Sequence, residues 1–179
     1  MTSTVLFGEV ARFAIECRMF KNEHETEISM YINGKNVLAF NKDGMHLTTR
    51  WNIDELVEWI RTFLDTMKED PYPVECEGNY AADKDIYARF FDSEDDEEFD
   101  AYYDKLDAWN ESHRWHPYSS GAILADLYFQ QIGDNVEISW NNQDSEVNFE
   151  EVNGGAVVPK DEFTTVVNSF LHYYAEYWF

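Results

Sequence analysis

The sequence is short of basic residues. Its 179 residues include 13 Lys and Arg against 36 Asp and Glu, which gives a formal net charge of −23. Small domains commonly carry a net charge of roughly 2 to 8 in magnitude. Such an excess of carboxylates repels the phosphates of nucleic acid and the anionic surfaces of membranes. We therefore expect neither direct nucleic-acid binding nor a membrane partner.

Cysteines and long apolar runs are also scarce. The two cysteines, Cys17 and Cys76, are far apart in the sequence and are expected to be free thiols. The opening residues, MTSTVLFGEV, lack the basic start and the long apolar run of a signal peptide. No segment approaches the ~20 apolar residues that a membrane-spanning helix needs. These absences predict a cytoplasmic protein.

Motifs for catalysis and for cofactor binding are missing. The chain has no Gly-x-Ser-x-Gly segment and no Gly-rich loop that leads from a strand into a helix. His113 and His116 are three residues apart, but a zinc site needs three or four ligands and no companion ligands lie nearby in the sequence. We therefore expect a non-enzymatic protein without a metal or another cofactor.

Aromatic residues are plentiful, and apolar residues recur with regular periods. Six Trp, 11 Tyr and 13 Phe supply large apolar surfaces for a core or an interface. Phe13, Ile15, Cys17 and Met19 alternate with smaller or polar residues, which predicts a strand. The segment EISMYINGKNVLAF, residues 27–40, predicts a hairpin that turns at Asn33-Gly34 and pairs Met30 with Val37 and Ile28 with Ala39.

A helix is expected over residues 51–70, after a loop. Asn52 can cap its start, and Glu55 completes a capping box. Apolar residues then follow at helical spacing until Pro71 and Pro73 end the helix: Leu56, Ile60, Phe63 and Met67.

The last third of the chain repeats this order. Two strands flank Gly133-Asp134, SEVNF at 145–149 supplies a third, VNGGAVVP is a loop, and a helix begins after Pro159. The apolar stripe of this helix comprises Phe163, Val166, Val167, Phe170, Leu171 and Tyr174. Individual residues also match: Glu-Ile-Ser occurs at 27–29 and at 137–139, Val37 and Phe40 correspond to Val147 and Phe149, and Asp54 corresponds to Asp161. The difference in residue number between matching positions falls from 110 at the first match to 107 at the last. The prediction is an α+β fold made of two β-β-β-α units with one or two antiparallel sheets.

A helical acidic insertion separates the two units. We expect one compact domain over 1–179, with unit one at 5–70, the insertion at 71–121 and unit two at 122–179. These parts differ in charge: 12 acids and 8 bases in 1–70, 14 and 4 in 71–121, and 10 and 1 in 122–179. A short helical turn is expected near 85–90 and a longer helix near 94–112, with Ser93 as its cap. Its buried stripe is expected to comprise Phe99, Tyr102, Leu106, Trp109 and His113.

Nine carboxylates lie within FFDSEDDEEFDAYYDKLDAWN, residues 90–110. We call them the acidic ridge: Asp92, Glu94, Asp95, Asp96, Glu97, Glu98, Asp100, Asp104 and Asp107. Counted from Asp92, the sixth residue is Glu97 and the twelfth is Tyr103, whereas an EF-hand needs Gly and Glu there. The stretch is therefore interpreted as the solvated face of a helix or as a docking surface for a basic protein, with Tyr102, Tyr103 or Trp115 as aromatic anchors where the core leaves them free.

In style, the whole chain resembles the immunity proteins of bacterial polymorphic and contact-dependent toxin systems. The resemblance lies in an acidic, Trp- and Tyr-rich α+β chain without catalytic motifs, and it implies a bacterial inhibitor that neutralises a basic toxin such as a nuclease. Two alternatives stay open. One is a DNA mimic that antagonises a restriction or other anti-phage defence enzyme, and the other is a structural subunit of a larger complex.

Overall fold

The computed structural model of the chain describes residues 2–20, 25–66, 69–115 and 123–178. Its first half contains the strands β1 (Thr2–Gly8), β2 (Phe13–Phe20), β3 (Glu25–Ile32), β4 (Lys35–Asn36), β5 (Ala39–Lys42) and β6 (Met45–Asn52), followed by helix α1 (Ile53–Thr66). Helices α2 (Ala81–Ala88) and α3 (Asp96–His113) form the insertion. The second half contains β7 (Leu127–Ile132), β8 (Asn135–Asn141), β9 (Asn148–Phe149) and β10 (Asn153–Pro159), then α4 (Lys160–Trp178). The fold is α+β with antiparallel sheets, as expected.

Two sheets organise these strands. One follows the order β1-β2-β3-β6-β5-β9, with β4 paired to β3, and the other is β10-β8-β7. One apolar core joins the inner faces of both sheets to α1 and α4. Phe63 of α1 lies 5.4 Å from Phe129 of β7 and 6.2 Å from Phe163 of α4, measured between ring centroids. Both halves therefore bury their apolar residues together. No helix of the described chain is long and apolar enough to span a membrane.

The first hairpin turns where the sequence predicts, but its register extends less far. Asn33 and Gly34 have φ of 51° and 84°, as a two-residue hairpin turn requires, and the N–H of Val37 donates to the carbonyl of Met30 at 2.9 Å. The predicted pairing of Ile28 with Ala39 is wrong: Ile28 pairs with Thr49 of β6. Residues 41–50, expected as a loop, form the end of β5 and most of β6.

The third strand of the second half also differs from the prediction. Residues 148–149 form the short strand β9, which pairs with β5 of the first half and sets Phe149 opposite Phe40. The strand that completes the second sheet is β10, in the segment predicted as a loop. The segment predicted as the third strand of the second half therefore pairs with the first half, and β10 takes its place in the second sheet.

The repeat is nevertheless visible in the strand register. The strands β2, β3 and β6 lead into α1 as β7, β8 and β10 lead into α4. Ile28 pairs with Cys17 and Thr49, and Ile138 pairs with Phe129 and Ala156. The offset is 110 on the middle strand and 107 from the third strand onward, the same pair of offsets found in the sequence.

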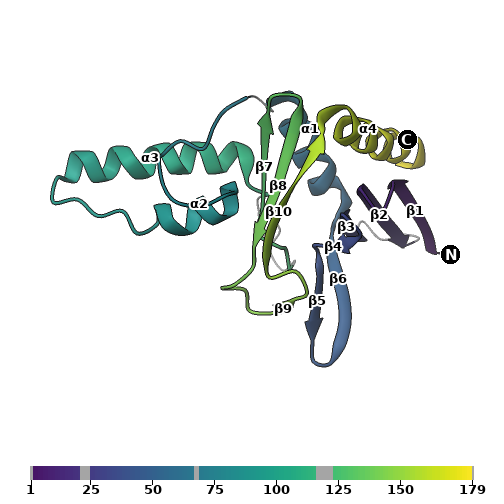
Figure 1. Ribbon diagram of the computed structural model, residues 1–179. Coiled ribbons are helices and arrows are strands. Elements are labelled where there is room, and N and C mark those ends of the chain that lie inside the picture. The colour runs from purple at the N-terminus through teal and green to yellow at the C-terminus, as the bar shows by residue number, and fades with distance from the viewer. Residues whose placement is uncertain (1, 21–24, 67–68, 116–122, 179) are drawn as a thin grey trace.

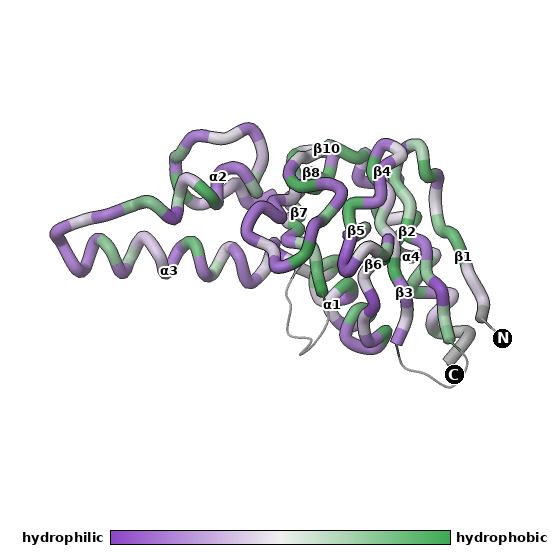
Figure 2. Tube along the Cα trace, turned by 90° about the horizontal axis from the view of Figure 1, so that it is seen from below, coloured by the Kyte–Doolittle hydropathy of each residue, from purple (hydrophilic) through white to green (hydrophobic). Residues whose placement is uncertain are grey.

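Helices α2 and α3 extend away from the sheets, on the side opposite β1 and α4 (Figures 1 and 2). We call residues 71–115 the arm. A second, smaller apolar cluster holds it together, in which Tyr72, Leu106 and Trp109 meet Tyr128 of β7. Helix α2 begins four residues before the predicted turn. Helix α3 is capped by Asp95, whose carboxylate accepts the N–H groups of Glu97 at 3.0 Å and Glu98 at 3.2 Å, so the predicted Ser93 cap is wrong.

Candidate functional site

Strand β8 holds the start of the arm through the second Glu-Ile-Ser segment. The first two N–H groups of α2 have no partner within their own helix. The carboxylate of Glu137 accepts the N–H of Ala81 at 2.8 Å, and the hydroxyl of Ser139 accepts the N–H of Ala82 at 3.1 Å. Glu137 is buried, and burial raises the pKa of its carboxyl group while the bond from Ala81 opposes that rise. Two strand side chains therefore cap a helix that does not cap itself.

A glycine lets this helix approach the sheet. A Cβ atom at Gly155 would lie 2.5 Å from the ring of Tyr80, the residue before α2. Real Cβ atoms do not come so close to other heavy atoms. The absence of a side chain on β10 therefore sets how closely the arm packs.

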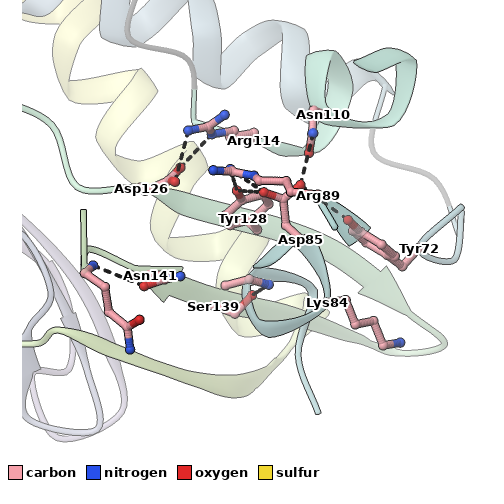
Figure 3. Close-up of polar contacts among 12 residues, drawn as sticks. Tyr72, Lys84, Asp85, Arg89, Asn110, Arg114, Asp126, Tyr128, Ser139 and Asn141 are labelled. Carbon is pink, nitrogen blue, oxygen red and sulfur yellow. Dashed lines mark hydrogen bonds and ion pairs between the residues drawn. The ribbon is translucent and has the colours of Figure 1, made fainter. Parts of the chain in front are cut away.

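Asp85 forms the polar centre of the contact between arm and sheet (Figure 3). The residue is 2 % exposed, and its carboxylate accepts hydrogen bonds from the hydroxyls of Tyr128 at 2.9 Å and Tyr72 at 3.3 Å and from the amide of Asn110 at 3.2 Å. Arg89, one turn further along α2, pairs with the same carboxylate. A buried carboxylate is stable only with such partners, because its desolvation is otherwise costly. The cluster therefore fixes α2, α3 and β7 to one another.

A second ion pair lies beside this cluster. Arg114 donates from Nε to Asp126 at 2.6 Å and from Nη2 to the other carboxylate oxygen at 3.0 Å, the forked geometry of a strong pair. Its guanidinium lies 5.7 Å from the ring centroid of Tyr128. Burial raises the pKa of Asp126, and the charges of Arg114 and Arg89 oppose the rise. The charges of both arginines thus stabilise the ionised form of Asp126.

The base of α3 is locked by aromatic contacts. Trp109 stacks on His113 with ring centroids 4.2 Å apart, and its indole donates to the carbonyl of Asp70 at 3.2 Å. Burial lowers the pKa of His113, whose Nδ1 lies 2.9 Å from the carbonyl oxygen of Trp109. His113 closes the apolar stripe as expected. Its companion in the sequence, His116, lies outside the described residues.

The acidic ridge lies on the free part of the arm. All nine of its carboxylates are exposed. No Lys, Arg or His of the described chain lies within ion-pair distance of any of them. One carboxylate oxygen of Asp95 accepts the hydrogen bonds that cap α3, and Glu98 accepts a hydrogen bond from the hydroxyl of Ser93 at 2.6 Å. The ridge is therefore a solvated row of uncompensated charge. Figure 2 shows hydrophilic residues recurring along α3.

Of the three aromatic residues predicted as anchors, one is taken up by the core. Trp115 is 1 % exposed and packs between Trp51 and Trp59, so the core uses it and it is wrong as an anchor. Tyr103 is half-buried, and its hydroxyl donates to the backbone carbonyls of Arg89 and Phe91.

Phe99, expected to be buried, is 37 % exposed; it lies in the first turn of α3, and its ring contacts that of Tyr103 with centroids 4.7 Å apart. The exposed aromatic residues that the prediction missed are Phe90, at 79 %, and Tyr87, at 50 %. The sequence held one signal for Phe90, its place at the end of a short helix directly before the acidic run.

Cysteines and potential metal ligands are the remaining reactive groups of the described residues. Both cysteines are free, as expected, and burial raises the pKa of the Cys17 thiol, which makes it less reactive. Among the described residues no group of three or more His, Cys, Asp or Glu side chains is placed to hold a metal ion. The arrangement thus defines an α+β protein with an acidic arm that is hydrogen-bonded to its second sheet. Comparisons with protein-family models, with curated proteins and with solved structures find no match for this chain.

Proposed function

We propose that this chain is an inhibitor that binds a basic protein through the acidic ridge, in the manner of a bacterial immunity protein that neutralises a toxin. The observation that carries the proposal is the ridge itself: nine exposed carboxylates, within a stretch that contains one lysine, without ion pairs to the described bases. Structural surface charges are usually interspersed with charges of the opposite sign. An unbalanced row favours a partner that supplies the missing cations.

The attachment of the arm supports this function. The Asp85 cluster and the cap from Glu137 hold α2 and α3 on the sheet before any partner arrives. A rigid surface loses less conformational entropy on binding than a flexible one. The charge accelerates the encounter, and apolar anchors provide the lasting contact. Phe90 and Tyr87 are the exposed residues of the arm best suited to that second role.

A nuclease toxin is the partner class that fits best, because a nuclease must present a basic cleft to hold phosphate. The same argument applies to a DNA-binding defence enzyme, for which the chain would be a DNA mimic. The identity of the captured partner separates the two: a toxin encoded beside this chain supports the immunity function, and a restriction or other defence enzyme supports mimicry. A partner with an acidic surface would contradict both and would favour a structural subunit.

The test compares two sets of charge reversals with the same change in net charge. One replaces Glu97, Glu98, Asp100 and Asp104 by Lys. The control replaces four exposed acids away from the arm by Lys: Glu9, Glu58, Asp134 and Glu146. Both proteins and the wild type serve as bait in extracts of the native host, and the captured proteins are identified by mass spectrometry.

We expect the wild type and the control to retain the partner and the ridge variant to lose it. Capture should also weaken at about 0.5 M salt, where the Debye length falls to ~4 Å. Equal loss from both variants would show that only total charge matters. Capture that the ridge variant retains would overturn the proposal. Circular dichroism of the ridge variant checks that the fold is unchanged.

A further inference from the structure

The two sheets end in four edge strands, and three of these edges are protected. An open edge presents unpaired N–H and C=O groups to which another strand can add. Strand β9 is only two residues long. The chain after α3 covers β7, because Arg114 forms a bridge with Tyr128 and the N–H of Trp115 donates to the carbonyl of Leu127 at 2.8 Å. Strand β10 contains two glycines and ends at Pro159, residues that weaken pairing at an edge.

Strand β1 is the fourth edge, and it has none of these protections. It is seven residues long and pairs one-to-one with β2, from Thr2 opposite Phe20 to Gly8 opposite Ala14, so no bulge interrupts it. Its sequence, TSTVLFG, contains no charged residue and no proline. Within the described chain, no strand pairs with its other side. Alternate residues of an edge strand direct their N–H and C=O groups away from the neighbouring strand, so β1 offers a regular row of free hydrogen-bonding groups.

The hairpin of β1 and β2 is also neutral in a strongly acidic chain. Residues 2–20 include two acids, Glu9 and Glu16, and two bases, Arg12 and Arg18, so the net charge of −23 arises from the rest of the chain. The arm with its acidic ridge extends on the side opposite β1 and α4 (Figure 1). Two copies of the chain that meet at β1 therefore bring neutral surfaces together and keep their acidic arms apart, where the repulsion between them is smallest.

We propose that β1 pairs with β1 of a second copy of this chain, antiparallel and about a two-fold axis, so that the two larger sheets become one. A two-fold arrangement uses the same surface on both copies, and each free edge therefore satisfies the other. With the axis at Val5, all seven residues of each strand are paired, and Thr4 lies opposite Leu6 of the second copy. Both residues are exposed in the single chain, Leu6 at 46 %, and the pairing partly covers them.

The test measures the mass of the purified full chain in solution. Sedimentation equilibrium is recorded from ~10 μM to ~1 mM, a range that includes the dissociation constants of weak dimers. We expect the mass to rise with concentration toward twice that of one chain. A wild type that stays monomeric over this range would overturn the proposal. Because no other protein is present, the outcome does not depend on whether the acidic ridge captures a partner.

A pair of charged variants locates the interface. Thr4→Lys combined with Leu6→Lys sets lysines directly opposite each other across the two-fold axis and should weaken dimerisation by at least about tenfold. Met45→Lys combined with Gln143→Lys makes the same change in charge at two exposed positions away from β1 and should dimerise as the wild type does. Equal weakening in both proteins, or none in the β1 variant, would contradict the interface.

Hydrogen exchange of the wild type is a second measurement that needs no substitution, and it decides the question even where the lysines perturb β1. In the dimer, the amides of β1 that point away from β2 are bonded to the second copy, whereas in the diluted monomer they face solvent. We expect these alternate amides to exchange at least about tenfold more slowly at high concentration, and the amides of α3 to be unaffected. A dimer whose β1 amides exchange equally fast at both concentrations would use another surface and would overturn the proposal.

Discussion

The two Glu-Ile-Ser segments occupy equivalent positions in the two sheets and have different surroundings. Glu137 and Ser139 are buried and cap α2. Glu27 faces a polar groove at the surface and pairs with Arg18 at 3.3 Å, while the hydroxyl of Ser29 lies 3.3 Å from that of Thr48. The same three residues in the same register therefore hold an insertion in one half and a network of polar side chains within a single sheet in the other.

The neighbouring strands explain the difference. Arg18 pairs with Glu27 where Gln130 pairs with Glu137, and Thr48 occupies the position that corresponds to Gly155. The glycine admits Tyr80, whereas a threonine fills that space. Arg18 and Arg50 also lie over the ring of Phe20, at 5.5 and 4.9 Å from its centroid. The first half neutralises its own face, and the second half covers its face with the arm.

The largest expected effect comes from breaking the contact that only the second half has. Asp85→Ala should lower the free energy of unfolding by about 3 kcal/mol, because four donors lose a buried acceptor. Glu27→Ala removes a surface ion pair and should cost less than about 1 kcal/mol. Urea unfolding of both variants measures the difference. Equal costs would show that the Asp85 cluster contributes no more than a surface pair.

Substitution of Glu137, the counterpart of Glu27, tests the cap of α2 directly. Glu137→Ala leaves the N–H of Ala81 buried without an acceptor and should cost about 2 kcal/mol. Glu137→Gln keeps an oxygen to accept that bond and should recover most of the loss. Amide hydrogen exchange at Ala81 and Ala82 reports the local effect. If the two variants exchange equally fast, the Glu137 side chain is not the cap.

The glycine supplies a third contrast. Gly155→Ala places a Cβ atom against Tyr80 and should cost about 1.5 kcal/mol through overpacking. Thr48→Ala, at the corresponding position of the first half, only removes atoms from a partly exposed side chain and should cost less. Thermal unfolding of the two variants orders the effects. A neutral Gly155→Ala would mean that Tyr80 moves freely and that the arm does not depend on this approach.

Much of the fold could be predicted from local sequence. Asn33-Gly34 and Gly133-Asp134 fix two hairpins through backbone conformations that few residues adopt, and the apolar stripes of α1 and α4 follow the helical period. Strand β10 could not be predicted because Gly154 and Gly155 resemble turn residues. The structure explains both glycines by tertiary contacts, since a Cβ atom would meet Trp140 at position 154 and Tyr80 at position 155.

The candidate site divides in the same way. The acidic ridge could be predicted, because nine carboxylates within 16 consecutive residues, six of them on α3, need no knowledge of the rest of the fold. Trp115 could not be assigned, because its burial depends on Trp51 and Trp59 from distant parts of the chain. The pocket between the arm and the second sheet could not be predicted either, because its wall combines Arg89 with residues that follow β8.

The smallest expected effect concerns pH and again separates the arm from the first half. His113 is 4 % exposed in the arm, whereas the side chain of His46 is 65 % exposed. Because burial lowers the pKa of His113, its imidazole takes up a proton near pH 6.5 in the unfolded chain and only at a lower pH in the folded chain. Stability should therefore fall by about 1 kcal/mol as the pH drops from about 7.5 to 5.5.

Other buried groups change stability with pH in the opposite direction, so a variant that lacks the imidazole is needed to isolate the contribution of His113. Burial raises the pKa of Glu137. As the pH falls, the folded state therefore binds more protons at this group than the unfolded state does, and the folded state gains stability. His113→Gln should lose the histidine contribution, so its free energy of unfolding should fall less between the two pH values. Ser112→Ala removes the hydroxyl 2.9 Å from Nδ1 but keeps the imidazole, and it should retain the wild-type pH dependence. If His113→Gln and the wild type changed in parallel, the histidine would not be neutral in the folded arm, and its packing against Trp109 would have to accommodate the charged ring.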